Sequence, residues 1–93
     1  MEFGRYVVLS TAHIRCSTAE ELTRWAALAP DLQPAAVSLT PYGWFVATRT
    51  GAESAALPAE LRAILAFGGT HDCDYVLLDC DGDKVAELAV FPW

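Results

Sequence analysis

The clearest strand in this chain of 93 residues is Asp74-Tyr-Val-Leu-Leu-Asp79, and a turn signal, Asp81-Gly82-Asp83, follows it closely. β-Branched and aromatic residues favour extended structure, whereas aspartate and glycine favour tight turns. Alternation along the strand places Tyr75 and Leu77 on one face of a sheet and their neighbours on the other. The remaining elements are predicted outward from this strand.

Upstream residues predict three more strands and two helices. The stretch from Ser17 to Glu20 has the spacing of a capping box, which predicts a helix start. Pro58 suits the first position of a second helix, and Gly68-Gly69 predicts its end. Pro41-Tyr42-Gly43 predicts a hairpin turn. The predicted strands cover residues 5–10, 36–40 and 44–49.

This order, strand-helix-strand-strand-helix-strand, is the split βαβ succession of ferredoxin-like α+β folds. It predicts one antiparallel sheet with two helices on one face. Residues 84–90 are expected either to return as an extra C-terminal edge strand or to form a helical turn. We interpret residues 1–93 as a single domain, because the chain has no repeat and no linker and is long enough for one core.

The charge balance limits the classes of partner. The chain has 12 acidic and 6 basic residues, a net charge of -6. This argues against direct binding to nucleic acid, because Lys and Arg supply the affinity for phosphate, and it favours a basic protein partner. The sequence shows neither a signal peptide nor an apolar run of transmembrane length. We therefore expect a cytoplasmic protein that does not bind membranes.

Half of the carboxylates lie within residues 72–87, where Lys84 is the only cation. Such a surface attracts basic proteins, although strand ends and turns also favour aspartate. A solvated acidic edge that protects edge strands is the alternative interpretation. With two glutamates of the first helix added, the predicted partner-binding residues are Asp72, Asp74, Asp79, Asp81, Asp83, Glu87, Glu20 and Glu21.

Aromatic residues suggest a second surface. Tyr75 would share an open sheet face with Tyr6 and with either Trp44 or Phe45. That arrangement would resemble the aromatic platform of an RNA-recognition module, but such a platform also needs basic residues, which are scarce here. The alternative prediction is that these rings pack against the C-terminal segment or against a partner protein.

We predict no catalytic residues, no cofactor and no metal. The run from Tyr75 to Asp83 resembles the first motif of haloacid-dehalogenase-type phosphatases, but too few residues follow for the rest of that domain. The aspartate spacing does not fit an EF-hand calcium loop. The three cysteines are interpreted as reduced thiols. A small metal-binding protein is a third hypothesis, whose zinc ligands would be His13, Cys16, His71 and Cys73.

Five segments together resemble a family of small uncharacterised proteins, a domain of unknown function found on proteobacterial plasmids, phages and integrated elements. The segments are Ser10-Thr-Ala-His-Ile14, Tyr42-Gly-Trp-Phe-Val46, Pro58-Ala-Glu-Leu61, residues 73–82 and Phe91-Pro-Trp93. The resemblance implies a mobile genetic element, where acidic proteins often inhibit defence systems.

The leading hypothesis is therefore a non-enzymatic inhibitor of the DNA-mimic type. It would bind the basic surface of a nucleic-acid-handling complex, either a restriction system or a Cas effector, with the type I CRISPR Cascade complex favoured. Such an inhibitor would be an anti-CRISPR protein. The runner-up is a plasmid or phage interaction module that uses its aromatic sheet face.

Overall fold

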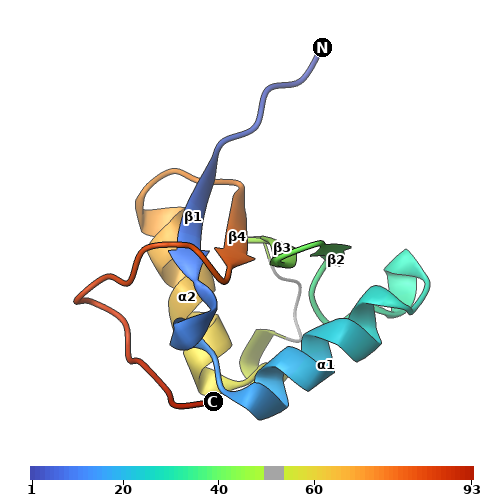
Figure 1. Ribbon diagram of the computed structural model, residues 1–93. Helices are drawn as coiled ribbons and strands as arrows, with labels where there is room; N and C mark the ends of the chain where they lie inside the picture. The colour runs from blue at the N-terminus through green and yellow to red at the C-terminus, as the bar shows by residue number, and fades with distance from the viewer. Residues whose placement is uncertain (50–53) are drawn as a thin grey trace.

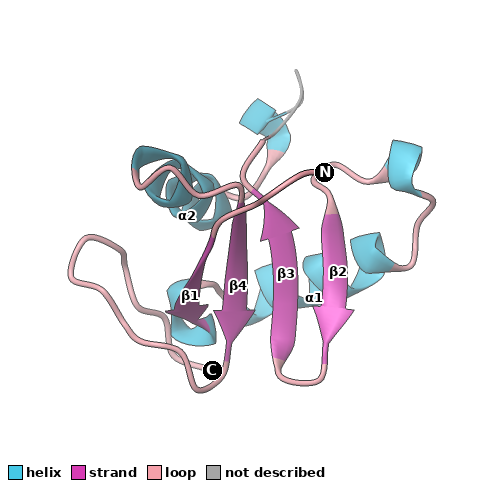
Figure 2. Ribbon diagram, turned by 90° about the horizontal axis from the view of Figure 1, so that it is seen from above, coloured by secondary structure: helices cyan, strands magenta, loops and turns pink. Residues whose placement is uncertain are grey.

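The computed structural model describes residues 1–49 and 54–93. The strands and helices follow the predicted order, and both helices lie on the same face of one sheet (Figures 1 and 2). The α+β class is therefore confirmed. The elements are β1 (Tyr6–Ser10), α1 (Cys16–Ala26), β2 (Val37–Thr40), β3 (Gly43–Ala47), α2 (Ala59–Thr70) and β4 (Tyr75–Asp79).

The sheet has the strand order β1-β4-β3-β2. β1 pairs with β4 in parallel, whereas β4 pairs with β3, and β3 with β2, in antiparallel fashion. The prediction of a wholly antiparallel sheet was therefore wrong, and the predicted ferredoxin-like arrangement is not confirmed. β4, the most apolar strand, takes an interior position between two neighbours, which suits a strand with buried side chains. β1 and β2 form the two edges.

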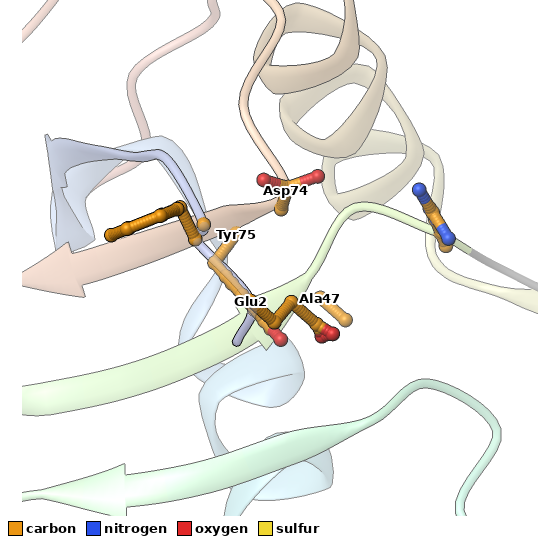
Figure 3. A pocket seen from close by; sticks show the side chains of 7 residues that line it. Glu2, Ala47, Asp74 and Tyr75 are labelled. Atoms are coloured by element: carbon orange, nitrogen blue, oxygen red, sulfur yellow. The ribbon is translucent and has the colours of Figure 1, made fainter.

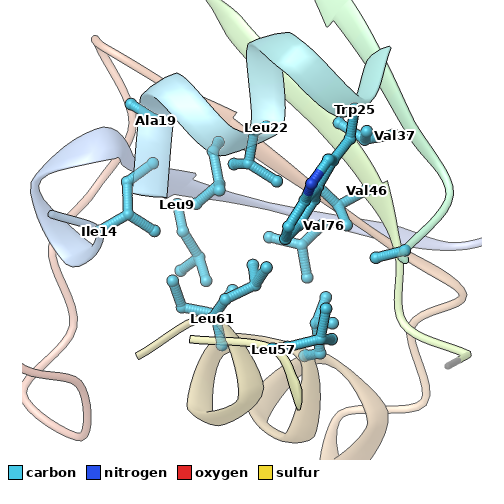
Figure 4. Packing of buried hydrophobic residues seen from close by; sticks show 14 residues of the cluster. Leu9, Ile14, Ala19, Leu22, Trp25, Val37, Val46, Leu57, Leu61 and Val76 are labelled. Atoms are coloured by element: carbon cyan, nitrogen blue, oxygen red, sulfur yellow. The ribbon is translucent and has the colours of Figure 1, made fainter. Parts of the chain in front are cut away.

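The hydrophobic core lies between the sheet and the helices (Figure 4). Val46, Val76 and Leu78 point from the sheet toward the helices and are fully buried. Leu22 of α1 and Leu61 of α2 meet them and are also fully buried. Alternate strand positions and helical spacing thus supply the two sides of one apolar cluster.

α2 does not end at Gly68-Gly69 as predicted but continues to Thr70. A Cβ atom added at Gly68 would lie 2.8 Å from Thr48 Cγ2 and 2.9 Å from Val76 Cγ2. Gly68 therefore permits close packing of the helix on the sheet rather than ending the helix.

The start of α1 also differs from the prediction. The helix begins at Cys16, so Ser17 is already helical and forms no capping box. Glu60 of α2 takes part of that role, because its Oε2 accepts hydrogen bonds from the Arg15 backbone N–H (3.0 Å) and the Thr18 hydroxyl (2.7 Å). An acid from the second helix thus satisfies an amide at the start of the first.

Residues 84–90 contain one turn, at residues 86–87, and otherwise no regular structure, so both the predicted extra edge strand and the alternative helical turn are absent from this described segment. The buried His13 side chain explains the difference. Its Nε2 accepts a hydrogen bond from the Val85 backbone N–H (3.0 Å), and its Nδ1 contacts the Ala89 carbonyl oxygen at 2.8 Å. The segment therefore folds around an imidazole ring and does not pair with the sheet.

The last three residues dock on the protein. The Phe91 backbone N–H donates to the Ala12 carbonyl (2.8 Å), and Trp93 Nε1 donates to the Ile14 carbonyl (2.9 Å). Arg15 lies over the Phe91 ring, 4.6 Å from its centroid. The C-terminal tail is thereby fastened beside the start of α1 (Figure 1).

Candidate functional site

The sheet face opposite the helices carries three aromatic rings, one from each of three strands. Phe45 of β3 stacks on Tyr75 of β4 with ring centroids 4.7 Å apart, and Tyr6 of β1 meets Phe45 edge-on at 6.0 Å. Tyr6 is 57% exposed and Tyr75 is 38% exposed. The rings thus order one another while keeping much of their surface open to solvent.

Val8 and Leu77 complete this apolar surface, because alternation places them on the same side as the rings. Trp44 points the other way, and its Nε1 donates a hydrogen bond to the Thr23 hydroxyl of α1 (3.1 Å). Of the two alternatives left by the sequence, Phe45 is therefore the residue on the open face. We call the set Tyr6, Val8, Phe45, Tyr75 and Leu77 the open face.

The C-terminal segment does not cover the open face. Its residues contact η1 (Thr11–His13) and the start of α1 instead. α1 and α2 both lie behind the sheet when the open face is viewed (Figure 2). Within residues 1–49 and 54–93, the part of the chain that lies against the open face is the N-terminal segment, where a Cβ added at Gly4 would lie 3.3 Å from Tyr75 Cε2. Contiguous exposed apolar surface of this kind marks interaction sites in soluble proteins.

A shallow pocket of 340 Å³ lies at the end of the open face where β4 begins (Figure 3). Asp74 and Tyr75 line it together with Glu2 and Arg49. Asp74 Oδ2 accepts a hydrogen bond from the Arg5 backbone N–H (2.9 Å), which holds the N-terminal segment beside β4. Acidic and basic groups are mixed at this end.

At the other end of β4, the short turn from Asp79 to Asp83 carries acidic side chains and no basic one. Asp79 Oδ1 accepts a hydrogen bond from the Asp81 backbone N–H (2.8 Å). Gly82 packs so closely on β1 that an added Cβ would lie 2.6 Å from the Leu9 carbonyl carbon. The neighbouring Asp83 carbonyl accepts a hydrogen bond from the Ser10 N–H (2.9 Å). The turn is thus fixed against the end of β1.

The two acidic groups are well separated. Asp74 and Asp79 stand five residues apart along β4, which corresponds to about 17 Å of extended chain. This is about twice the screening length of charges at physiological salt. Asp74 and the turn from Asp79 to Asp83 therefore lie at opposite ends of the open face, and the carboxylates of residues 72–87 do not form one continuous row.

The other predicted binding residues lie elsewhere. Asp72 occupies a left-handed conformation (φ 59°) in the turn after α2, a place that favours aspartate for local reasons. Glu87 is exposed in the C-terminal segment, and Glu21 forms an ion pair with Arg24 on α1. Because α1 lies behind the sheet, Glu20 and Glu21 are not part of the open face (Figure 2).

The hypothetical zinc ligands do not come together within the described residues. His13 uses both ring nitrogens in contacts with the C-terminal segment, and His71 packs on the Phe67 ring with centroids 4.4 Å apart. Cys73 is buried, whereas Cys16 and Cys80 are exposed. Side-chain atoms of Asp79, Cys80 and Asp81 do lie within 4.8 Å of one another, an arrangement common among exposed acidic groups.

Glu60 is an important acid that the sequence interpretation missed. Partial burial raises the pKa of its carboxyl, but the hydrogen bonds from Thr18 and from the Arg15 backbone N–H, together with the Arg15 charge, hold that pKa below its usual range. Nothing in the sequence indicates this role, because the partners lie on another helix.

The fold is that of a small α+β protein with a mixed sheet, and its open face carries the exposed side chains of Tyr6, Val8 and Tyr75. The model of the family of unknown function DUF5983, C-terminal domain, matches residues 6–93, so the chain belongs to this family. The expected relation to an uncharacterised family is confirmed. A search of curated proteins and a search of solved structures each found no match. The described helices are too short or too polar to cross a membrane.

Proposed function

We propose that this chain is a non-enzymatic interaction module that binds a partner protein through its open face. The observation that supports this most strongly is the ordered set of rings on a sheet face that neither the helices nor the C-terminal segment covers, with Tyr6 and Tyr75 exposed and Phe45 half-buried. Partly exposed aromatic residues are enriched where proteins bind one another, because they bury a large area and keep a polar group for solvent.

The charge distribution supports a partner with basic groups around an apolar surface. Carboxylates lie at both ends of the open face. The acidic turn from Asp79 to Asp83 makes no ion pair with residues 1–49 or 54–93. A complementary partner presents an apolar centre flanked by Lys or Arg, which would speed association and make it sensitive to salt. Such a partner fits better than RNA, which would need a basic face.

Nucleic-acid-handling proteins carry basic surfaces of this kind. The most specific form of the proposal is an inhibitor from a plasmid or phage that blocks a cytoplasmic Cas effector or restriction complex. The type I CRISPR Cascade complex remains the favoured target. Because the two acidic groups are about 17 Å apart, the open face supplies most of the contact area in this proposal and the carboxylates supply orientation.

The test compares tyrosines on and off the open face. Wild-type protein captures partners from a host lysate, the captured protein is purified, and its affinity is measured by calorimetry. Replacing Tyr6 and Tyr75 by threonine is expected to weaken binding at least about a hundredfold, since aromatic anchors at interfaces are worth about 2 kcal/mol or more. Tyr42→Thr is the control, because Tyr42 is 63% exposed in the β2–β3 turn.

Equal affinity for the wild-type and double-variant proteins would overturn the proposal. So would tight binding of a single-stranded RNA oligonucleotide that depends on the same two tyrosines. Loss of affinity in an Asp79→Asn, Asp81→Asn, Asp83→Asn variant alone, with the tyrosine variants unaffected, would favour the original mimicry hypothesis over the open face.

A further inference from the structure

The backbone of β1 presents hydrogen-bonding groups on its outer side. The Arg5 carbonyl accepts a hydrogen bond from the Tyr75 N–H (3.1 Å). In a parallel ladder the residues that face the partner strand alternate, so Val7 and Leu9 also face β4. The backbone groups of Tyr6 and Val8 therefore point away from the sheet. Ser10 follows the same alternation, because its N–H points outward and donates a hydrogen bond to the Asp83 carbonyl.

This outer side is open along most of its length. No residue of 1–49 or 54–93 hydrogen-bonds the outward backbone groups of Tyr6 or Val8. Both residues are exposed, Tyr6 by 57% and Val8 by 40%. Proteins usually protect an exposed edge with Lys, Pro, a bulge or a covering segment, and residues 6–9 contain neither Lys nor Pro. Only the end at Ser10 is occupied.

The other edge of the same sheet is protected. The Gln33 side chain occupies both backbone groups of Val37 in β2. Its Oε1 accepts a hydrogen bond from the Val37 N–H (3.1 Å), and its Nε2 donates one to the Val37 carbonyl (3.4 Å). Pro41, which has no N–H, follows the strand. Only Leu39 keeps outward groups on β2. The two edges therefore differ, and β1 alone can pair with a second strand of useful length.

We infer that the β1 edge accepts an extended, cationic segment of the partner protein as an added strand. This inference rests on the proposed function, because the added strand would extend the open face. Alternate side chains of the segment would pack beside Tyr6 and Val8, and strand addition would supply main-chain hydrogen bonds. Near the Ser10 end, Lys or Arg would meet Asp81 and Asp83. A second copy of this chain is disfavoured by its own net charge of -6.

The test uses a short synthetic peptide of alternating valine and lysine, with binding measured by calorimetry and by amide hydrogen exchange. We expect binding together with slowed exchange of the Tyr6 and Val8 amides. A peptide with the same side chains but with alternate backbone nitrogens methylated should bind at least about tenfold more weakly, because it cannot complete the ladder. That comparison holds peptide charge constant.

A matched pair of protein variants gives a second readout. Val8→Pro removes one outward N–H from β1, and Leu39→Pro removes one from β2, at edge positions where proline is tolerated. We expect Val8→Pro to weaken peptide binding at least about tenfold and Leu39→Pro to leave it unchanged. Circular dichroism checks that each variant folds. If Val8→Pro does not fold, strand addition is tested by comparing the affinities of the methylated and unmethylated peptides for the wild-type protein.

The outcomes separate this inference from the proposed function. Absence of peptide binding, equal binding of the methylated peptide, or equal effects of the two proline variants would overturn strand addition. Continued dependence of the captured partner on Tyr6 and Tyr75 would then leave the proposed function standing. A wild-type dimer that Val8→Pro dissociates would show that a second copy, and not a cationic segment, occupies the edge.

Discussion

The two faces of the sheet are built from alternate residues of the same strands, yet they differ in what covers them. Val76 and Leu78 of β4 are fully buried under the helices, whereas Tyr75 between β1 and β3 is 38% exposed. Both sets are largely hydrophobic, although only the open face carries tyrosine hydroxyls. The covered face accounts for stability, whereas recognition is the role that we propose for the open face. This division can be tested with paired variants.

The largest expected effect comes from neighbouring leucines of β4. Leu78→Ala leaves a cavity in the core and should lower the free energy of unfolding by about 2–5 kcal/mol. Leu77→Ala, on the open face, should cost about 1 kcal/mol or less, because its side chain is only partly buried. Urea denaturation measures both values. Similar losses for the two variants would contradict the division between faces.

The second prediction concerns the residue that fastens the C-terminal segment away from the open face. His13→Ala removes the hydrogen-bond partner of the Val85 backbone N–H and of the Ala89 carbonyl, both in part-buried contacts, and should cost about 2 kcal/mol. Hydrogen exchange of the Val85 amide should accelerate. His71→Ala is the control, because that ring is exposed. Unchanged protection of Val85 would contradict the role given to His13.

Two adjacent glycines of α2 sharpen the account of the covered face. Gly68→Ala would force its Cβ against Thr48 and Val76 and should cost about 1 kcal/mol or more. Gly69→Ala meets no atom within 4 Å, so alanine's higher helix propensity should raise stability by about 0.5–1 kcal/mol. Thermal unfolding distinguishes the two. A stabilising Gly68→Ala would mean that α2 lies farther from the sheet.

The smallest expected effect is a pH dependence that arises where the two helices meet. The folded-state pKa of Glu60 is lowered, so its contribution is present above the unfolded-state pKa and is lost as the pH falls through the folded-state pKa. The difference in unfolding free energy between wild type and Glu60→Gln should therefore shrink toward acidic pH. A difference that stays constant with pH would contradict the proposed hydrogen bonds to Thr18 and Arg15.

Local patterns predicted the elements well, because strand propensity, turn residues and helical spacing act over a few residues. They did not predict that β1 runs parallel to β4, since pairing depends on contacts between distant segments. The same limit explains the missed roles of Glu60 and His13, whose partners are distant in sequence. Sequence identified the residues of the acidic stretch but not their division between the two ends of β4.

The candidate site was predictable in part. The expectation that Tyr6 and Tyr75 share one face agrees with the structure, whereas the sequence leaves the choice between Trp44 and Phe45 open. That choice depends on the register of β3 against β4, in which Trp44 stands opposite the buried Leu78. Register is set by packing of a whole face, so it follows from the assembled sheet and not from one strand.

The most direct measurement of the central claim uses the three tyrosines of the chain. Replacing them with 3-fluorotyrosine gives one fluorine resonance for each of Tyr6, Tyr42 and Tyr75, and the purified partner is then titrated in. Binding through the open face predicts that the Tyr6 and Tyr75 resonances shift while that of Tyr42 stays in place. A shift confined to Tyr42, or saturated binding with the other two unmoved, would contradict the account.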